Sequence, residues 1–231
     1  MMFMFPIIST AKNDAVILND RKYLLGSHGL SRALPWIIKE SGNDYIILVQ
    51  EYGGSVIENP RQGKLPGVMS FLPYTLEQTI IVRPNELLTD VVLKNTSERV
   101  IKYNLGMHPA FKVIGARDKI DFESDTRQER TSLKELVDSE RAIFYHGATE
   151  MTYHHEKGLL IMGTKGFGEM MLWTSHDDLE NATMFCIEPV TNIPDQKNKK
   201  YWSPGQRCEI IKQNQNRNYS MNIKIAQFRG T

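Results

Sequence analysis

Short segments in which apolar and polar residues alternate recur through this sequence, and they limit it to a fold built from β-strands. In the clearest, Tyr219–Ile225, residues Tyr219, Met221, Ile223 and Ile225 share one face and polar residues occupy the other. Alternation with a period of two is typical of a strand that is buried on one side. Because such segments follow one another with frequent turns, the sequence predicts an all-β fold, an antiparallel β-sandwich or barrel.

The expected strands cover most of the chain, and Thr131–Ser139 is the segment that tolerates a helical interpretation. Pro84–Asn85–Glu86 is expected to be the turn of a hairpin. Up to about Trp36 the pattern predicts short strands and loops. No repeat or shift in composition marks a boundary, so residues 1–231 are expected to form one domain. The strands are expected at Tyr45–Val49, Thr79–Arg83, Leu87–Lys94, Val100–Phe111, Lys119–Phe122, Gly158–Gly163, Glu169–Ser175, Thr183–Pro189, Cys208–Gln213 and Tyr219–Ile225.

Composition excludes several kinds of protein. The 231 residues carry a formal net charge of +1, and this near balance argues against a nucleic-acid partner, which would need a basic face to neutralise phosphates. The apolar start MMFMFPIIS is short and lacks a basic region, so it is expected to be neither a signal peptide nor a membrane span. Two cysteines, Cys186 and Cys208, do not make a disulfide framework, and no zinc-binding spacing is present. A cytoplasmic protein with no metal site and no membrane partner is expected.

The segment VIKYNLGMHPAF, Val100–Phe111, offers the first candidate for chemistry. Its alternation places Ile101, Tyr103, Leu105 and Met107 on the core side, and His108 at the end of the polar side. Pro109 is expected to stop the strand, because proline has no N–H to donate. The pattern alone allows two interpretations, a solvated histidine at a strand end or an imidazole held at the edge of a cleft.

Glu188 offers a second candidate in the same setting. In Met184–Pro189 it shares a face with Met184 and Cys186, and Pro189 is expected to end that strand. A carboxyl group among apolar neighbours loses hydration, and burial raises its pKa towards the range of a useful base. The alternative is a surface glutamate. If the two strand ends converge, His108 and Glu188 would form an acid–base pair.

Other familiar sites are absent from the sequence or weakly indicated. There is no GxSxG, no GxGxxG after a strand and no phosphate-binding P-loop. His28 lies in the glycine-containing stretch GSHGLSR, with Arg32 four residues later, and lone loop histidines are commonly structural or exposed. Trp36, Trp173 and Trp202 are expected in the core, although an exposed indole would stack on the C–H face of a sugar.

Four segments together resemble the aldose 1-epimerase (galactose mutarotase-like) family, most closely its bacterial branch of uncharacterised sugar epimerases. GSHGLSRALPW resembles the family's HGFAR segment, and LGMHPAF resembles its His-Pro-aromatic segment. CIEPVTN is similar to its IEPW segment and YWSPGQRCEII to its closing PGE strand. The four occur in the family's order and span nearly the whole chain.

The resemblance implies a β-sandwich of the galactose-mutarotase type with an open carbohydrate cleft. It implies that Glu188 is the base that takes the proton of the anomeric hydroxyl and that His108 is the acid that protonates the ring oxygen. His28 would contact the sugar, and Arg32 would bind hydroxyls or support the site. The reaction it implies needs no cofactor, and the partner would be an aldohexose.

Three differences from the family stand beside the resemblance. The strands that usually precede the Phe5–Pro6 segment have no counterpart, so we expect a sandwich that lacks its first strands or is completed otherwise, for example by a second chain in a homodimer. Val190 stands where the branch usually has tryptophan. The family's acidic residue before an Ala-Leu-Ile-Phe-like strand is replaced by Arg141, with Asp138 and Glu140 nearby.

The sequence therefore predicts an aldose 1-epimerase, or mutarotase, for a free hexose. Two other functions remain open on the same fold. One is a carbohydrate-binding or regulatory protein without activity. The other is an epimerase for a phosphorylated hexose, which Arg32 and the lysines at 197, 199 and 200 would favour, although no phosphate cradle is visible.

Overall fold

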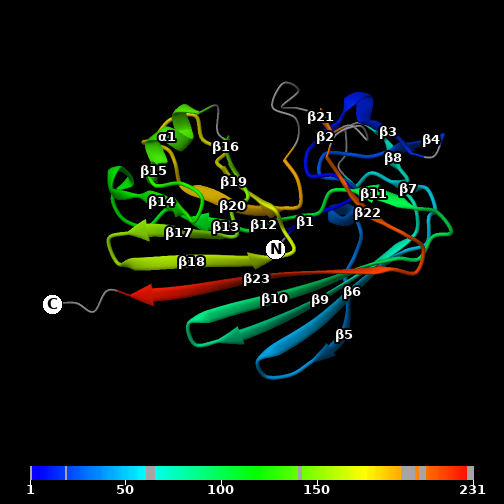
Figure 1. The fold of residues 1–231 in the computed structure, drawn as a ribbon, viewed down its shortest axis with the longest axis horizontal. Helices are drawn as coiled ribbons and strands as arrows, with labels where there is room; N and C mark the ends of the chain where they lie inside the picture. Colours follow the sequence, from blue (N-terminus) through cyan, green and yellow to red (C-terminus); the bar gives the residue numbers. More distant parts are fainter. Residues whose placement is uncertain are drawn as a thin grey trace.

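Two antiparallel β-sheets make up most of the molecule, and the fold class expected from the alternation is confirmed (Figure 1). The computed structural model describes residues 2–18, 20–60, 66–139, 142–193, 201–202 and 207–227. Among these, no helix is both long enough and apolar enough to cross a membrane. The two sheets share one large apolar core, to which the buried residues of both contribute.

The larger sheet contains nine strands among the described residues, and it extends beyond the sandwich at one end. The hairpin of β9 (Tyr74–Arg83) and β10 (Glu86–Asn95) turns at Pro84–Asn85, as predicted, and the two strands pair over their full length. In spatial order the strands are β15 (Thr131–Ser132), β14 (Asp121–Ser124), β17 (Glu150–His155), β18 (Gly158–Lys165), β23 (Asn216–Gln227), β10 (Glu86–Asn95), β9 (Tyr74–Arg83), β6 (Tyr45–Tyr52) and β5 (Ile37–Ser41).

The smaller sheet has six described strands and carries the candidate site. β20 (Met184–Val190) lies at its centre, with β19 (Glu169–Trp173) on one side. Both β12 (Gly106–His108) and β13 (Ala110–Lys112) lie on the other side. The strands are β1 (Met2–Met4), β12 (Gly106–His108), β20 (Met184–Val190), β19 (Glu169–Trp173) and β16 (Ala142–His146) in spatial order, with β13 (Ala110–Lys112) beside β20.

Short strand pairs gather at the end of the molecule away from the C-terminus, on the right of Figure 1. One pair is parallel and the others are antiparallel. The parallel pair is β2 (Thr10–Ala11) with β21 (Tyr201–Trp202), and the others are β3 (Ala15–Leu18) with β4 (Arg21–Leu24), β7 (Ile57–Glu58) with β8 (Val68–Met69) and β11 (Ile101–Tyr103) with β22 (Glu209–Ile211).

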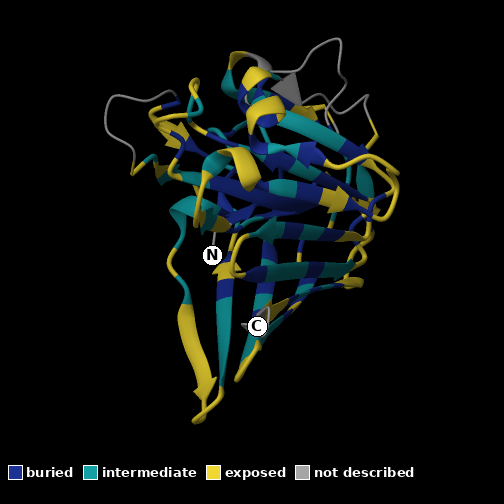
Figure 2. Cartoon of the chain, turned by 90° about the vertical axis from the view of Figure 1, so that its left-hand side faces the viewer, coloured by how far each residue is buried: buried dark blue, intermediate teal, exposed yellow. Residues whose placement is uncertain are grey.

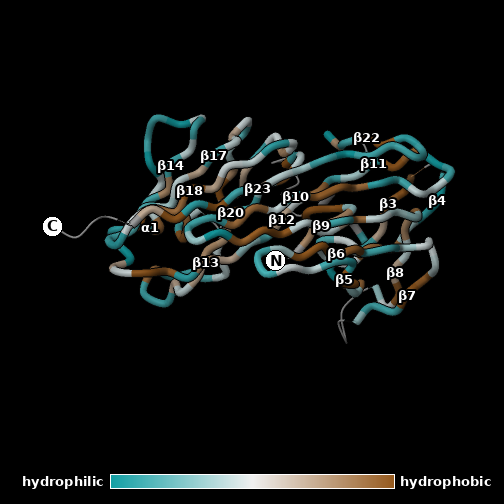
Figure 3. The backbone as a smooth tube through the Cα atoms, turned by 90° about the horizontal axis from the view of Figure 1, so that it is seen from below, coloured by the Kyte–Doolittle hydropathy of each residue, from teal (hydrophilic) through white to brown (hydrophobic). Residues whose placement is uncertain are grey.

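Hydrophobic stretches run through the central strands of both sheets, whereas the turns that join them are hydrophilic (Figure 3). In β10, Thr89, Val91 and Leu93 share one face and are all buried. In β23 the predicted inward face is correct for Tyr219, Met221 and Ile223. It is wrong for Ile225, which is 51% exposed.

The smaller sheet does not cover the whole of the larger sheet (Figure 2). Strand β5 is exposed along its whole length, and it projects at the bottom of Figure 2 beyond the region that the smaller sheet covers. The period of two fixes which face of a strand is apolar, but it does not say how far along the strand the opposite sheet reaches. The alternation of apolar and polar residues therefore continues into parts of the larger sheet that the smaller sheet does not cover.

The segment Val100–Phe111 is three short strands, β11, β12 and β13, so the prediction of one continuous strand is wrong. The chain changes partner within it: β11 pairs with β22, and β12 pairs with β1 and β20. At the break, the Asn104 N–H donates to the Pro6 carbonyl over 2.8 Å and the Leu105 N–H donates to Thr191 Oγ1 over 3.0 Å. Pro109 separates β12 from β13, as expected.

Pro189 does not end its strand, which is a second correction. β20 continues to Val190, and Pro189 lies opposite Met170 of β19. On its other side β20 pairs with β12 at Val190 and with β13 only up to Cys186, so Pro189 lies where that ladder is interrupted. A proline fits within a sheet where no ladder needs its missing N–H.

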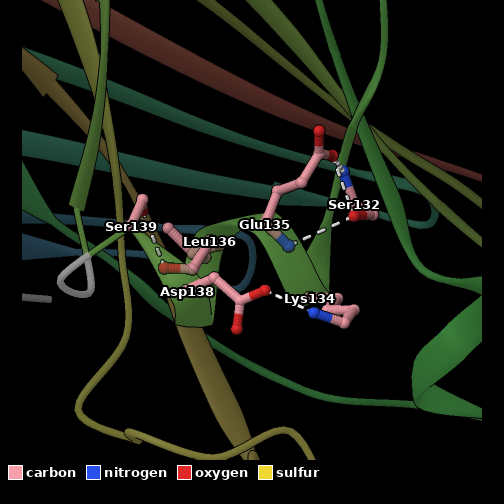
Figure 4. A network of polar contacts seen from close by, with 6 residues as sticks. All are labelled: Ser132, Lys134, Glu135, Leu136, Asp138 and Ser139. Carbon is pink, nitrogen blue, oxygen red and sulfur yellow. Dashed lines mark hydrogen bonds and ion pairs between the residues drawn. The ribbon is translucent and has the colours of Figure 1, made fainter.

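The predicted helical segment contains α1 (Leu133–Asp138), which a capping box begins (Figure 4). Ser132 Oγ accepts from the Glu135 N–H, and the Glu135 carboxylate accepts from the Ser132 N–H over 2.6 Å. This reciprocal pair satisfies two backbone donors that the helix itself leaves without partners. Lys134 and Asp138 form an ion pair on the exposed side, and Leu133, Leu136 and Val137 are buried.

We expect Ser132→Ala to lower the free energy of unfolding by about 1 kcal/mol, because the cap acceptor is lost. Ser132→Thr keeps that acceptor and is the matched control, with a much smaller loss expected. Chemical denaturation followed by circular dichroism measures both. Equal losses in the two variants would contradict the role of the capping box.

Candidate active site

His108 and Glu188 come together on the face of the smaller sheet that points away from the main core. Met107 and Ile187 precede them in the chain and are buried in that core, so the alternation turns His108 and Glu188 to the other face. His108 Nε2 lies 3.3 Å from Glu188 Oε1. Two strands that are distant in the sequence therefore place an imidazole beside a carboxyl group.

Glu188 is more deeply buried than a surface acid would be. Its side chain is 0% exposed, and neither carboxylate oxygen has a hydrogen-bond partner among the described residues. Burial raises the pKa of Glu188 well above its ordinary value, because the charged form loses its hydration. A ligand can contact this carboxyl group only after the side chains that cover it shift.

His108 has the opposite shift. Its side chain is 13% exposed, and burial lowers its pKa, with the charge of Arg32 as the second cause. Both the buried imidazole and the buried carboxyl group therefore favour their neutral forms. Transfer of a proton from Glu188 to His108 gives the form with a free carboxylate and an imidazolium, which the burial of both groups disfavours.

His28 faces His108, with its ring centroid 5.5 Å away and the two rings nearly perpendicular. His28 Nδ1 lies 2.9 Å from the Ile8 carbonyl oxygen, which can only accept, so Nδ1 carries the proton and Nε2 is the acceptor of the neutral ring. The residue has a φ of 62°, and Gly29 has a φ of 75°. A Cβ on Gly29 would lie 2.2 Å from the Phe5 carbonyl oxygen, so the loop needs glycine there.

Arg32 lies at the other end of the same loop, in the 3-10 turn Ser31–Ala33. Its Nη1 donates to the Ser27 carbonyl over 3.3 Å, and its charge acts on His108. Arg32 also lines a cavity of about 260 Å³, whereas the other three predicted site residues do not line it. The cavity is lined by Thr10, Asp14, Gly26, Ser27, Gly29, Arg32, Ala33, Asn59, Pro60 and Met69.

Cys186 shares the face of Glu188, and sequence reasoning placed it there but assigned it no part in the site. Among the described residues, His108, Cys186 and Glu188 bring potential metal-ligating atoms within 4.8 Å of one another. Burial, with the nearby Glu188 as the second cause, raises the pKa of Cys186 to about 12. Both the thiol and the carboxyl group would have to lose protons for a metal ion to bind, so this donor set fits metal binding poorly at neutral pH.

Val190 is buried with Met4, Ile8 and Ile193 in a small apolar cluster on the site face. A buried apolar residue therefore stands where the family branch usually has tryptophan. Two other expectations lie outside the described residues, namely the positions of Glu140 and Arg141 and the lysines at 197, 199 and 200. Pro204 of the closing segment also lies outside them.

Replacing Glu188 by glutamine should stabilise the protein at neutral pH. Because its folded-state pKa is raised, Glu188 contributes stability at pH values below its ordinary pKa and loses it as the pH rises towards the folded-state value. At pH 7 the neutral amide avoids this loss, and we expect Tm to rise by several degrees, at about 2–4 °C per kcal/mol for a chain of this size.

The difference in Tm between Glu188→Gln and the wild type should narrow below about pH 4, where Glu188 of the wild type is protonated in both the folded and the unfolded state. Thermal unfolding at pH 7 and pH 4 measures it, with the exposed Glu180→Gln as control. A Glu188→Gln variant less stable than the wild type at pH 7 would contradict the cost of burying this carboxylate.

Removing the charge of Arg32 should raise the pKa of His108, because that charge is the second cause of its lowering. Since burial is the first cause and persists, the pKa in Arg32→Gln should still lie below its ordinary value. The chemical shift of the His108 Cε1–H as a function of pH measures it, with the exposed Arg21→Gln as control. If the pKa of His108 is unchanged in Arg32→Gln, the charge of Arg32 does not act on His108.

Solved structures with the same fold include three from lactobacilli. A galactose mutarotase-like protein from Lactobacillus casei superposes with a TM-score of 0.78 at 16% identity, over 97% of this chain and 84% of its own. A galactose mutarotase related enzyme from Lactobacillus acidophilus gives 0.77 at 14% identity, over 97% and 82%. A galactose 1-epimerase from the same species gives 0.60 at 8% identity, over 98% and 80%.

No protein-family model matches the sequence, and no curated protein matches it either. The likeness is therefore one of structure. Both layers of the sandwich and nearly the whole described chain take part in it. The chain has the galactose mutarotase-like fold, as the resemblance of its four sequence segments predicts.

Proposed function

We propose that this protein is an aldose 1-epimerase that interconverts the α and β anomers of a free hexose. The observation that supports this proposal is the pairing of His108 Nε2 with Glu188 Oε1 at 3.3 Å on one face of a sheet. A buried base beside a buried acid suits a reaction that removes one proton and delivers another. The fold and the order of the four sequence segments support the same class of reaction.

In this mechanism the carboxylate of Glu188 accepts the proton of the anomeric hydroxyl while the imidazolium of His108 donates a proton to the ring oxygen. The bond between C1 and the ring oxygen breaks as the C1 carbonyl forms. After rotation about C1–C2, the ring closes on the other face of C1 with both proton transfers reversed. Each turnover returns the pair to its starting protonation, so no net proton is consumed.

Burial disfavours the productive form of the pair, because it favours the neutral form of each group. The pair needs one proton in total, and its productive form has that proton on His108. Loss of the proton at high pH and gain of a second at low pH both remove this form, so the rate should follow a bell-shaped pH profile. Arg32 and His28 would bind hydroxyl groups of the sugar from the loop beside His108.

An epimerase for a phosphorylated hexose is the second candidate, because the positive charge of Arg32 acts on His108. The cavity that Arg32 lines also contains Asp14, whose carboxylate would repel a phosphate. The free sugar is therefore the better substrate for the described residues.

Polarimetry on freshly dissolved α-glucose and α-galactose tests the proposal. The wild type should accelerate mutarotation, and His108→Ala and Glu188→Ala should each lower turnover by roughly 10²-fold or more. His176→Ala and Glu180→Ala are matched controls from outside the site and should keep near-native rates.

Sugar binding without any rate above the buffer background would identify a carbohydrate-binding protein instead. A higher kcat/KM for glucose 6-phosphate than for glucose would favour the phosphorylated substrate. A near-native rate in either site variant would remove that residue from the mechanism.

A further inference from the structure

The site face carries a strip of apolar side chains, Phe144, Met171 and Trp173, that the acid–base mechanism does not use. We infer that this apolar strip binds the hydrocarbon face of the sugar, with Trp173 as the stacking residue. The inference rests on the proposed function. It assigns a binding surface to the C–H face of the sugar, for which the acid–base mechanism names no protein contact.

Strand register places the apolar strip directly beside the acid–base pair. Met171 lies opposite Glu188, and Phe144 lies opposite Met171 on the next strand. Trp173 lies opposite Cys186, the residue two before Glu188 in β20. Directly opposed residues of antiparallel strands project to the same face, so all three side chains lie on the face of Glu188.

Packing does not account for Trp173 and Met171. Both are half-buried, yet among the described residues they join neither the main core nor the small cluster around Val190. Trp36 behaves as a core residue, since it packs against the main core with its ring centroid 5.4 Å from that of Phe3. The expectation that tryptophan serves the core therefore fits Trp36 and does not fit Trp173.

The indole of Trp173 also touches the catalytic candidate. Its ring centroid lies 5.6 Å from that of His108, and the two rings are nearly perpendicular. His28 meets His108 in a second perpendicular contact. A ligand that reaches His108 therefore comes within reach of Trp173 as well.

The ligand chemistry follows from the two kinds of surface around His108. The loop supplies polar groups from His28 and Arg32, whereas the apolar strip supplies the indole of Trp173 and the thioether of Met171. Phe144 packs against the small cluster around Val190 and borders the strip. A pyranose has a rim of hydroxyl groups and a face of C–H groups, so it matches both surfaces at once. Aromatic rings pack well against such apolar faces, and binding sites combine apolar walls with a few polar groups.

Intrinsic fluorescence with a sugar that cannot open its ring tests this inference apart from catalysis. Methyl α-D-glucopyranoside and methyl α-D-galactopyranoside are suitable probes. The wild type and Trp36→Phe should show a change in fluorescence on titration, because both keep Trp173. Trp173→Phe should lose that change, although it keeps two other tryptophans.

Steady-state kinetics give a second readout. Trp173→Ala should raise KM about tenfold and change kcat by less than about threefold, and Trp173→Phe should recover part of the affinity. Trp36→Phe, whose ring packs against the main core, is the matched control and should keep the native KM. Thermal unfolding shows which variants are folded, and if Trp173→Ala is not, the Trp173→Phe titration still decides.

A fluorescence change that survives in Trp173→Phe, or a native KM in both Trp173 variants, would overturn the inference. A wild type that binds the methyl glycosides through Trp173 without accelerating mutarotation would overturn the proposed function and leave the binding surface standing. If the wild type accelerates mutarotation and neither Trp173 variant changes KM or the fluorescence response, the proposed function stands and the inference about Trp173 is wrong.

Discussion

The carboxyl group of Glu188 is the feature on which the arrangement of the site depends. It sits in the central strand of the smaller sheet, fully buried and without a hydrogen-bond partner among the described residues. Unpartnered burial of a polar group of this kind costs about 1–3 kcal/mol. The large core between the two sheets offsets that cost.

The neighbours of Glu188 come from parts of the chain that are far apart in the sequence. β12 and β13 share one side of β20, and the break between them leaves His108 facing Glu188. The N-terminal segment then fixes the loop of His28, since the Phe5 carbonyl accepts from the Leu30 N–H over 2.8 Å. Backbone contacts of this kind hold side chains more rigidly than a surface loop could hold them alone.

Much of the fold could be predicted because its causes are local. The period of two identified most strands and their inward faces, as in Tyr219, Met221 and Ile223, and the turn residues Pro84–Asn85 gave the hairpin. Where one strand changes partner could not be predicted, because the break near Leu105 depends on Thr191. How far the opposite sheet covers a strand also depends on residues that are distant in the sequence, and the exposure of Ile225 could not be predicted for this reason.

In the site, too, some residues could be predicted from local sequence and others could not. His108 and Glu188 could be proposed from the sequence because each has an uncommon setting next to a proline and because family-like segments surround them. Trp173 could not be assigned, since an apolar residue in an alternating strand looks the same whether a core or a ligand covers it. Only the register of β19 against β20 separates the two possibilities.

Gly29 shows how a residue without chemistry can belong to a site. The N-terminal segment and the loop of His28 approach so closely that the Phe5 carbonyl occupies the space of any side chain at this position. The spacing between these two backbones therefore sets the place of the imidazole that faces His108. A substitution at this contact would change the orientation of a bound ligand, although neither Gly29 nor the Phe5 carbonyl touches that ligand.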